Sequence, residues 1–192
     1  MRNTGENPGR SVSKTLEVRN SQARFRIDCR LMRRILGVLM GELVPGRPFN
    51  LGVNIIDTEG MTRLNETFLR HAGSTDVLAF DYSEPGDTNS VVGELFLCAD
   101  EALIQSRRYG TTWQGELVRY AVHGILHLLG YQDRTASLRR QMKREEDRLL
   151  RQVMGRFAIG KLGSIRDLRA LRARLPRRGR VTVAPKRINK SW

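Results

Sequence analysis

The stretch that most constrains this chain runs from His123 to Asp133 and reads HGILHLLGYQD. It holds two histidines four residues apart in an apolar segment typical of a helix, so both side chains lie on one face. Gly130 allows the chain to leave this helix through a left-handed turn, which can bring the carboxylate of Asp133 back toward the histidines. Two imidazoles and a carboxylate suit a catalytic zinc ion, with a fourth position open to water. We therefore interpret His123, His127 and Asp133 as the ligands of one Zn²⁺ ion.

The same stretch has other interpretations. Two histidines on a helix can be ordinary packing residues. A zinc protease is a further alternative, but its motif places a glutamate directly after the first histidine as general base, and Gly124 stands there. Glu116 lies seven residues before His123, two helical turns away, which is too far to replace that base. The sequence therefore argues against the usual protease chemistry and leaves other metal-assisted hydrolysis open.

Positive charge is concentrated at one end of the 192-residue chain. The net charge is +14, and residues 156–192, with twelve Lys or Arg and one acid, carry 11 of these charges. We predict a disordered leader at 1–14, a folded domain at 15–155 and a basic tail at 156–192 that binds RNA or the ribosome through phosphate contacts. The predicted RNA-binding residues of the tail are Arg169, Arg172, Arg177, Arg178 and Arg180. The alternative is a basic surface that serves only solubility.

The cysteines and the hydropathy pattern bear on the compartment. Cys29 and Cys98 fit neither a disulfide framework nor a zinc pattern, and we expect both to be small core residues. The N-terminal residues lack an apolar signal segment, and no stretch approaches the apolar length of a membrane span. We therefore expect a cytoplasmic protein without a membrane partner.

The order of predicted elements indicates an α+β fold, a small mixed sheet of about four strands packed with about five helices. Strand-like alternation occurs at 16–18, 49–56, 74–82 and 91–98. Helical spacing occurs at 27–44, 58–68, 100–109, 112–129 and 135–154, with a further short amphipathic helix predicted at 164–175. The histidine pair lies on the helix at 112–129, so the expected metal site is on that helix.

Several motifs of this chain resemble those of the YbeY family, bacterial endoribonucleases of ribosomal RNA maturation. The family signature is His-Gly-x-Leu-His-Leu-x-Gly-Tyr-Asp-His. The matching positions here are His123, Gly124, Leu126, His127, Leu128, Gly130 and Tyr131, with Asp133 in place of the third histidine. Upstream, Thr75-Asp76-Val77-Leu78 and Phe80 resemble the family's Thr-Asp-Val-Leu-Ser-Phe, with Leu64-Asn65 at the family's spacing before them. The segment Gly93-Glu94-Leu95 resembles its Gly-Asp/Glu-Ile strand. The resemblance extends from about Leu16 to Met154.

Two positions depart from the family pattern. Asp133 replaces a histidine ligand, and a carboxylate lowers the net charge of a metal centre, which makes bound water less acidic. The family commonly has a functional arginine where Leu69 stands, and Arg70 follows one residue later. One residue on a helix is a rotation of about 100°, so Arg70 is a candidate catalytic residue that points in a different direction. His71 is either a surface loop residue or part of the cleft.

The pair Thr75-Asp76 also has two interpretations. It can cap and turn the start of a strand, or it can orient a ligand histidine from behind.

The resemblance implies a zinc-dependent, single-strand-specific endoribonuclease in ribosomal RNA maturation and ribosome quality control. In this hypothesis Arg70 or another basic residue neutralises charge on the scissile phosphate. The implied partners are ribosomal RNA and the small ribosomal subunit, together with ribosomal proteins or a GTPase. Two rival functions are an RNA-binding ribosome-assembly protein with a structural metal and no catalysis, and a zinc hydrolase of another substrate such as a peptide.

Overall fold

The computed structural model describes residues 14–70, 72–87 and 89–166. A four-stranded sheet contains β1 (Lys14–Asn20), β3 (Phe49–Ile56), β5 (Val91–Cys98) and β4 (Val77–Asp81), in that order. The first three are parallel, and β4 runs antiparallel to β5. The α-helices within these ranges are α1 (Cys29–Leu43), α2 (Thr58–Leu69), α3 (Ala99–Tyr109), α4 (Trp113–Leu128) and α5 (Ala136–Arg156). The predicted α+β class is confirmed.

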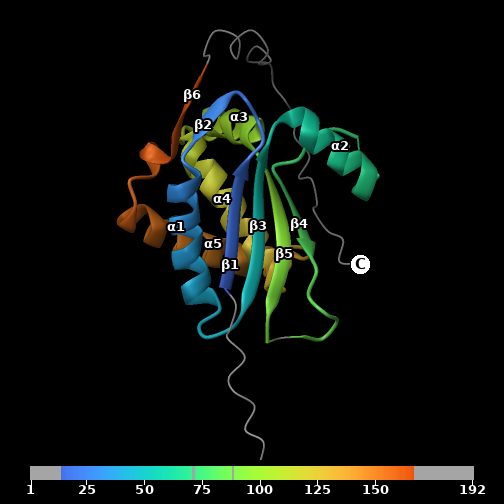
Figure 1. Cartoon of the computed structure of the whole chain (residues 1–192). Helices are drawn as coiled ribbons and strands as arrows, with labels where there is room; N and C mark the ends of the chain where they lie inside the picture. The colour runs from blue at the N-terminus through green and yellow to red at the C-terminus, as the bar shows by residue number, and fades with distance from the viewer. Residues whose placement is uncertain (1–13, 71, 88, 167–192) are drawn as a thin grey trace, which may run out of the picture.

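Alternating side chains give the sheet two different faces. Val77, Leu95 and Leu97 point into the main core beneath α4, whereas Leu78 and Cys98 point to the opposite face and pack with α2. In Figure 1 the sheet lies in front of α4 and α5, with α2 to one side near the upper end of β4 and β5. The histidine-bearing helix α4 therefore lies between the sheet and α5.

Gly124 explains how closely α4 approaches the sheet. A Cβ atom at this position would lie 2.8 Å from a Leu95 methyl carbon and 3.2 Å from one of Val77. A Cβ contact of 2.8 Å is essentially never seen, so a side chain at this position would require Leu95 or α4 itself to shift. The residue that a zinc protease would use as general base is here a packing glycine.

Polar side chains cap the starts of several helices. The side chain of Asp28 accepts a hydrogen bond from the backbone N–H of Leu31 at 2.9 Å, and Thr112 accepts one from Gly115 at 3.1 Å. Thr135 caps α5 in the same way, through the N–H of Leu138. Each cap satisfies a helix N–H that has no partner within its own helix.

A second sheet was not predicted. β2 (Phe25–Ile27) pairs antiparallel with β6 (Gly163–Ile165), so the helix expected from Ile27 begins only at Cys29. The helix predicted at 164–175 is wrong at its start, because Ser164 pairs with Arg26 as a strand. The remainder of that predicted helix lies outside the described residues.

The folded body continues past the expected boundary at residue 155. After α5, the short 3₁₀ helix η1 (Ile159–Leu162) buries Ile159 and Leu162 against the main core. The predicted leader 1–14, apart from Lys14, and the predicted tail arginines 169, 172, 177, 178 and 180 fall outside the described residues. Within the described part of the chain, no helix combines the length and apolar character that crossing a bilayer requires.

Candidate metal centre and cleft

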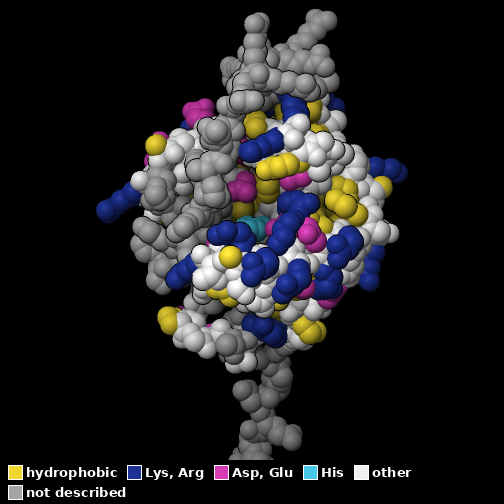
Figure 2. Space-filling view, turned by 180° about the vertical axis from the view of Figure 1, so that it is seen from behind, with side chains coloured by type: hydrophobic (Ala, Val, Ile, Leu, Met, Phe, Trp, Pro, Cys, Tyr) yellow, Lys and Arg dark blue, Asp and Glu magenta, His cyan; other side chains and the backbone are white. Residues whose placement is uncertain are grey.

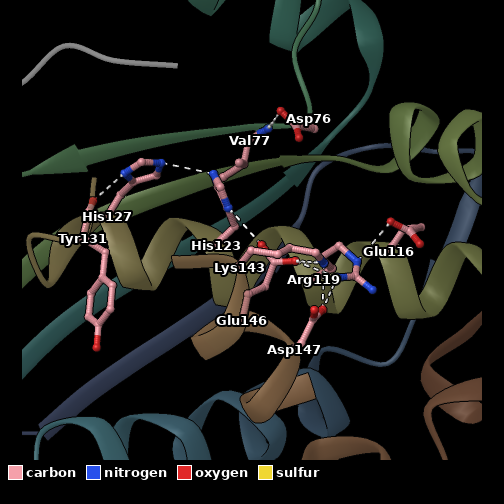
Figure 3. Close-up of polar contacts among 10 residues, drawn as sticks. All are labelled: Asp76, Val77, Glu116, Arg119, His123, His127, Tyr131, Lys143, Glu146 and Asp147. Atoms are coloured by element: carbon pink, nitrogen blue, oxygen red, sulfur yellow. Dashed lines mark hydrogen bonds and ion pairs between the residues drawn. The ribbon is translucent and has the colours of Figure 1, made fainter. Parts of the chain in front are cut away.

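His123 and His127 face each other on α4. Their Nε2 atoms lie 3.1 Å apart, and the ring planes meet at 83° with centroids 4.7 Å apart (Figure 3). Both side chains are half-buried, with 23% of the His123 side chain exposed. The i, i+4 spacing thus brings two potential ligand nitrogens to one point at the edge of the core.

His127 is oriented by the turn that ends its own helix. Gly130 adopts φ +85°, its N–H bonds to the carbonyl of His127 at 2.9 Å, and the N–H of Tyr131 bonds to Leu126 at 3.0 Å. These two bonds form a Schellman motif, which requires a left-handed residue that glycine adopts without strain. The motif turns the Tyr131 carbonyl toward Nδ1 of His127, at 3.1 Å. The predicted role of Gly130 as the helix stop is confirmed.

His123 is oriented by a residue of a different helix. Its Nδ1 lies 3.1 Å from Oε2 of Glu146, a buried residue of α5 that is 6% exposed. The other carboxylate oxygen accepts hydrogen bonds from Arg119 at 2.6 Å and Lys143 at 3.2 Å (Figure 3). Burial alone would raise the pKa of Glu146, but the hydrogen bonds from His123 and Arg119 and the charge of Lys143 outweigh it and lower the pKa to about 2. Glu146 is therefore an ionised, fully engaged carboxylate.

These contacts determine which ring nitrogens carry protons. A carboxylate and a carbonyl can only accept, so each Nδ1 donates and each neutral ring has its lone pair on Nε2. Two lone pairs 3.1 Å apart repel one another, and a cation between them removes that repulsion. Burial and the nearby His123 lower the pKa of His127, which favours the neutral form that binds metals. The pair of imidazoles therefore fits a zinc ion.

The third predicted ligand lies near this pair but does not complete it. Asp133 lines the same cleft as His127, and its charge partly opposes the lowering of the His127 pKa. Its backbone carbonyl accepts a hydrogen bond from Arg139 at 3.1 Å, which ties the segment after the turn to α5. Across residues 14–70, 72–87 and 89–166, no three His, Cys, Asp or Glu side chains gather closely enough to hold a metal ion. The two histidines therefore come together as the sequence pattern predicts, whereas Asp133 lines the cleft next to them.

A cleft of about 700 Å³ opens beside His127. One wall is formed by residues 79–87 at the end of β4 and the loop that follows, and the other by residues 127–134. The first wall contributes Asp81, Glu84 and Asp87, and the cleft also includes Arg47 and Arg134. Figure 2 shows a histidine side chain at the bottom of a hollow, with Lys and Arg side chains gathered beside it.

Comparison with known proteins places most of the chain in one family. A family model described as Endoribonuclease YbeY matches residues 17–154, which include both histidines, Asp133 and Glu146. The chain belongs to the YbeY family. The YbeY endoribonuclease of Chlorobaculum parvum is 33% identical over 140 residues, covering 73% of this chain and 96% of that protein. The one from a Nocardioides species is 38% identical over 107 residues, covering 52% and 72%.

The fold is also similar to a solved structure. The solution structure of TM1509 from Thermotoga maritima superposes with a TM-score of 0.55 at 21% identity, covering 74% of this chain and 91% of that one. This likeness shows that the two chains share a fold.

Of the other predicted YbeY site residues, Arg70 does not line the cleft. It ends α2 in the left-handed conformation, with φ 53°, and is exposed. His71 lies outside the described residues. Thr75 and Asp76 make the contacts of a strand-start turn: the Thr75 hydroxyl and the Val77 N–H both donate to Asp76 Oδ1 at 3.0 Å. The Nδ1 atoms of the two rings contact Glu146 and the Tyr131 carbonyl, and the charge of Asp76 partly opposes the lowering of the His127 pKa.

Sequence reasoning missed Glu146 and Arg119. Glu146 occupies an inward position of α5, among Met142, Leu149 and Val153. Burying an acidic side chain on the apolar side of a helix costs free energy unless the acid has a partner. The position of Glu146 among apolar residues was therefore the sequence signal that this acid is paired. Arg119 pairs with Glu146 at 2.6 Å, Asp147 at 3.3 Å and Glu116 at 3.5 Å.

Proposed function

We propose that this YbeY-family chain is a zinc-dependent endoribonuclease of single-stranded RNA that acts in ribosomal RNA maturation and ribosome quality control. The observation that carries the proposal is the pair of Nε2 atoms 3.1 Å apart, with each Nδ1 already engaged. His123, His127 and Asp133 would hold the ion. When bound, zinc supplies Lewis-acid polarisation of a phosphoryl oxygen and activation of water at neutral pH.

The chain's own residues would prepare the site for this chemistry. Glu146 and the Tyr131 carbonyl keep both rings in the tautomer that offers Nε2. The cleft beside His127 would receive a nucleotide strand, and Arg134 on its wall would neutralise charge on the scissile phosphate; Arg70, which does not line the cleft, is the second candidate for this role. The tail arginines would add phosphate contacts. Ribosomal RNA and the small ribosomal subunit, with ribosomal proteins or a GTPase, are the proposed partners in the cytoplasm.

Peptide hydrolysis fits the site less well. A zinc protease needs a carboxylate that is free to take a proton from water. The carboxylate in contact with the histidine pair, that of Glu146, is bound by Arg119, Lys143 and His123, and its pKa is about 2. Such a group is a weak base at neutral pH, because proton affinity falls with pKa. This favours a phosphodiester substrate, whose cleavage depends more on charge stabilisation.

The test compares purified wild-type protein, His127→Ala and the control Gln141→Ala, an exposed α5 residue. Bound zinc is measured by elemental analysis, and cleavage is followed on labelled single-stranded RNA. We expect wild type and control to bind zinc and cleave, and His127→Ala to lose both. Equal zinc stoichiometry in His127→Ala would refute the metal assignment. Loss of zinc with undiminished cleavage would refute the zinc dependence of the reaction. Zinc binding by a wild type that cleaves no RNA would favour a structural metal in an RNA-binding assembly protein.

A further inference from the structure

Three arginines line up along the solvent-facing side of α5. Arg140, Arg144 and Arg151, here called the α5 arginine stripe, are all exposed. At about 100° per residue they fall within a sector of about 40°. The buried residues of the helix, Met142, Glu146, Leu149, Leu150 and Val153, lie on the opposite side. The stripe is therefore directed away from the core.

The acids of α5 do not neutralise this stripe. Glu145 pairs with Arg148 at 2.7 Å, Asp147 pairs with Lys143 at 2.7 Å, and Glu146 is bound by Arg119. Within the described residues, no ion pair involves any of the three stripe arginines. Three guanidinium groups on one helix face thus present uncompensated positive charge to solvent, which attracts a polyanion.

Helix α5, which carries the stripe, begins beside the cleft. Thr135 caps α5 two residues after Asp133, and Arg139 donates a hydrogen bond to the Asp133 carbonyl. From Arg140 to Arg151 the helix rises about 16 Å. The other wall of the cleft presents the carboxylates of Asp81, Glu84 and Asp87 (residues 79–87). An anionic strand leaving the cleft therefore meets attraction along α5 and repulsion along the loop after β4.

We propose that the α5 arginine stripe binds the sugar–phosphate backbone of single-stranded RNA that flanks the cleavage site. The strand then leaves the cleft over α5 and not over the loop between β4 and β5. Guanidinium groups bind phosphates through paired hydrogen bonds without reading the bases, so this surface adds affinity and direction without sequence preference. The proposal rests on the proposed function for its substrate and adds the path that the substrate follows.

The test uses the full chain in a His127→Ala background, so that binding is measured without cleavage. One variant combines Arg140→Gln, Arg144→Gln and Arg151→Gln. The matched control combines Arg30→Gln, Arg33→Gln and Arg107→Gln, exposed arginines of α1 and α3 that enter no ion pair within the described residues. Affinity for a labelled single-stranded oligouridine is measured across a salt titration, and circular dichroism verifies that each variant is folded.

We expect the stripe variant to bind about 10-fold more weakly at low salt, with a log–log salt slope reduced by about 2, because each lost phosphate contact on a single strand contributes about 0.7 to that slope. The control should keep the slope of its His127→Ala parent. An unchanged slope in the stripe variant would overturn the proposal and leave an acidic protein surface as the partner of α5. An equal loss in the control would also overturn it, because net charge alone would then explain the effect.

Cleavage by the otherwise wild-type chain separates this proposal from the proposed function. If wild type cleaves RNA and the stripe variant binds and cleaves equally well, only the stripe proposal fails. If wild type binds oligouridine through the stripe but cleaves no RNA, the proposed function fails and the stripe stands.

Discussion

The two histidines of α4 are held in different ways. The His127 ring is held by a carbonyl four residues further along the chain, within the turn that ends its helix. The His123 ring is held by Glu146, which is 23 residues away and on another helix. The difference teaches that one half of the site forms with a local turn, whereas the other half requires α5 to dock. The two halves can therefore be disturbed separately.

The largest expected effect comes from Glu146→Ala. This change leaves Arg119 without its closest carboxylate and His123 without its partner, and breaking a buried pair costs about 3–5 kcal/mol. Denaturant unfolding measures the loss. Glu146→Gln, which keeps an acceptor for His123, should lose less stability and weaken zinc binding about 10–100-fold. Equal stability of both variants and wild type would show that His123 does not depend on α5.

Lowering the pH should destabilise the half of the site that contains His123 and Glu146, and to a smaller extent the half that contains His127. Because the pKa of Glu146 is lowered from 4.5 to about 2, its ionised form stabilises the fold above pH 4.5. That contribution, about 3 kcal/mol, should be lost as the pH falls toward 2. The pKa of His127 is also lowered from 6.5, so a smaller loss should begin as the pH falls below 6.5. Unfolding free energies across this range, with chelator present, measure both. A Glu146→Gln profile that still falls below pH 4.5 by the same amount would contradict the assignment.

Gly130→Ala disturbs the half of the site that contains His127 and the turn after its helix. A Cβ at this position meets no atom within 4 Å, so the cost is conformational and should be about 1–2 kcal/mol for a left-handed alanine. Zinc affinity should fall as well, because the Tyr131 carbonyl that orients His127 depends on the turn. Gly130→Asn is the matched control, since asparagine tolerates this conformation better. Indistinguishable alanine and asparagine variants would show that backbone conformation at this residue does not control His127.

The smallest effect is expected from Arg139→Gln. Its hydrogen bond to the Asp133 carbonyl lies at the surface, so stability should change by less than about 0.5 kcal/mol. Zinc affinity should nevertheless decrease, because this contact connects the Asp133 segment to α5. Calorimetric titration of zinc into the variant measures that decrease, and an unchanged affinity would argue that Asp133 is not a ligand.

The two halves of the site also differ in how far the sequence predicts them. The histidine pair, the turn at Gly130 and the caps at Asp28 and Thr112 were predictable, because each depends on residues within a few positions. The role of Glu146 was not, since it depends on how α5 docks on α4.

The same limit applies to the fold. Alternation and helical spacing predicted the α+β class and the main sheet, but not β2 and β6, two strands of three residues separated by most of the chain. Such short segments carry too few residues to show a period.

The pairing of β2 with β6 affects the order in which the protein matures. Phe25–Ile27 is synthesised early, and its partner Gly163–Ile165 follows only after every helix of the described body has been made. A nascent chain thus carries His123 and His127 before Glu146 exists to hold one of them, and its second sheet closes later still. The contact between His123 and Glu146 can therefore form only after α5 has been synthesised, and the pairing of β2 with β6 follows after that.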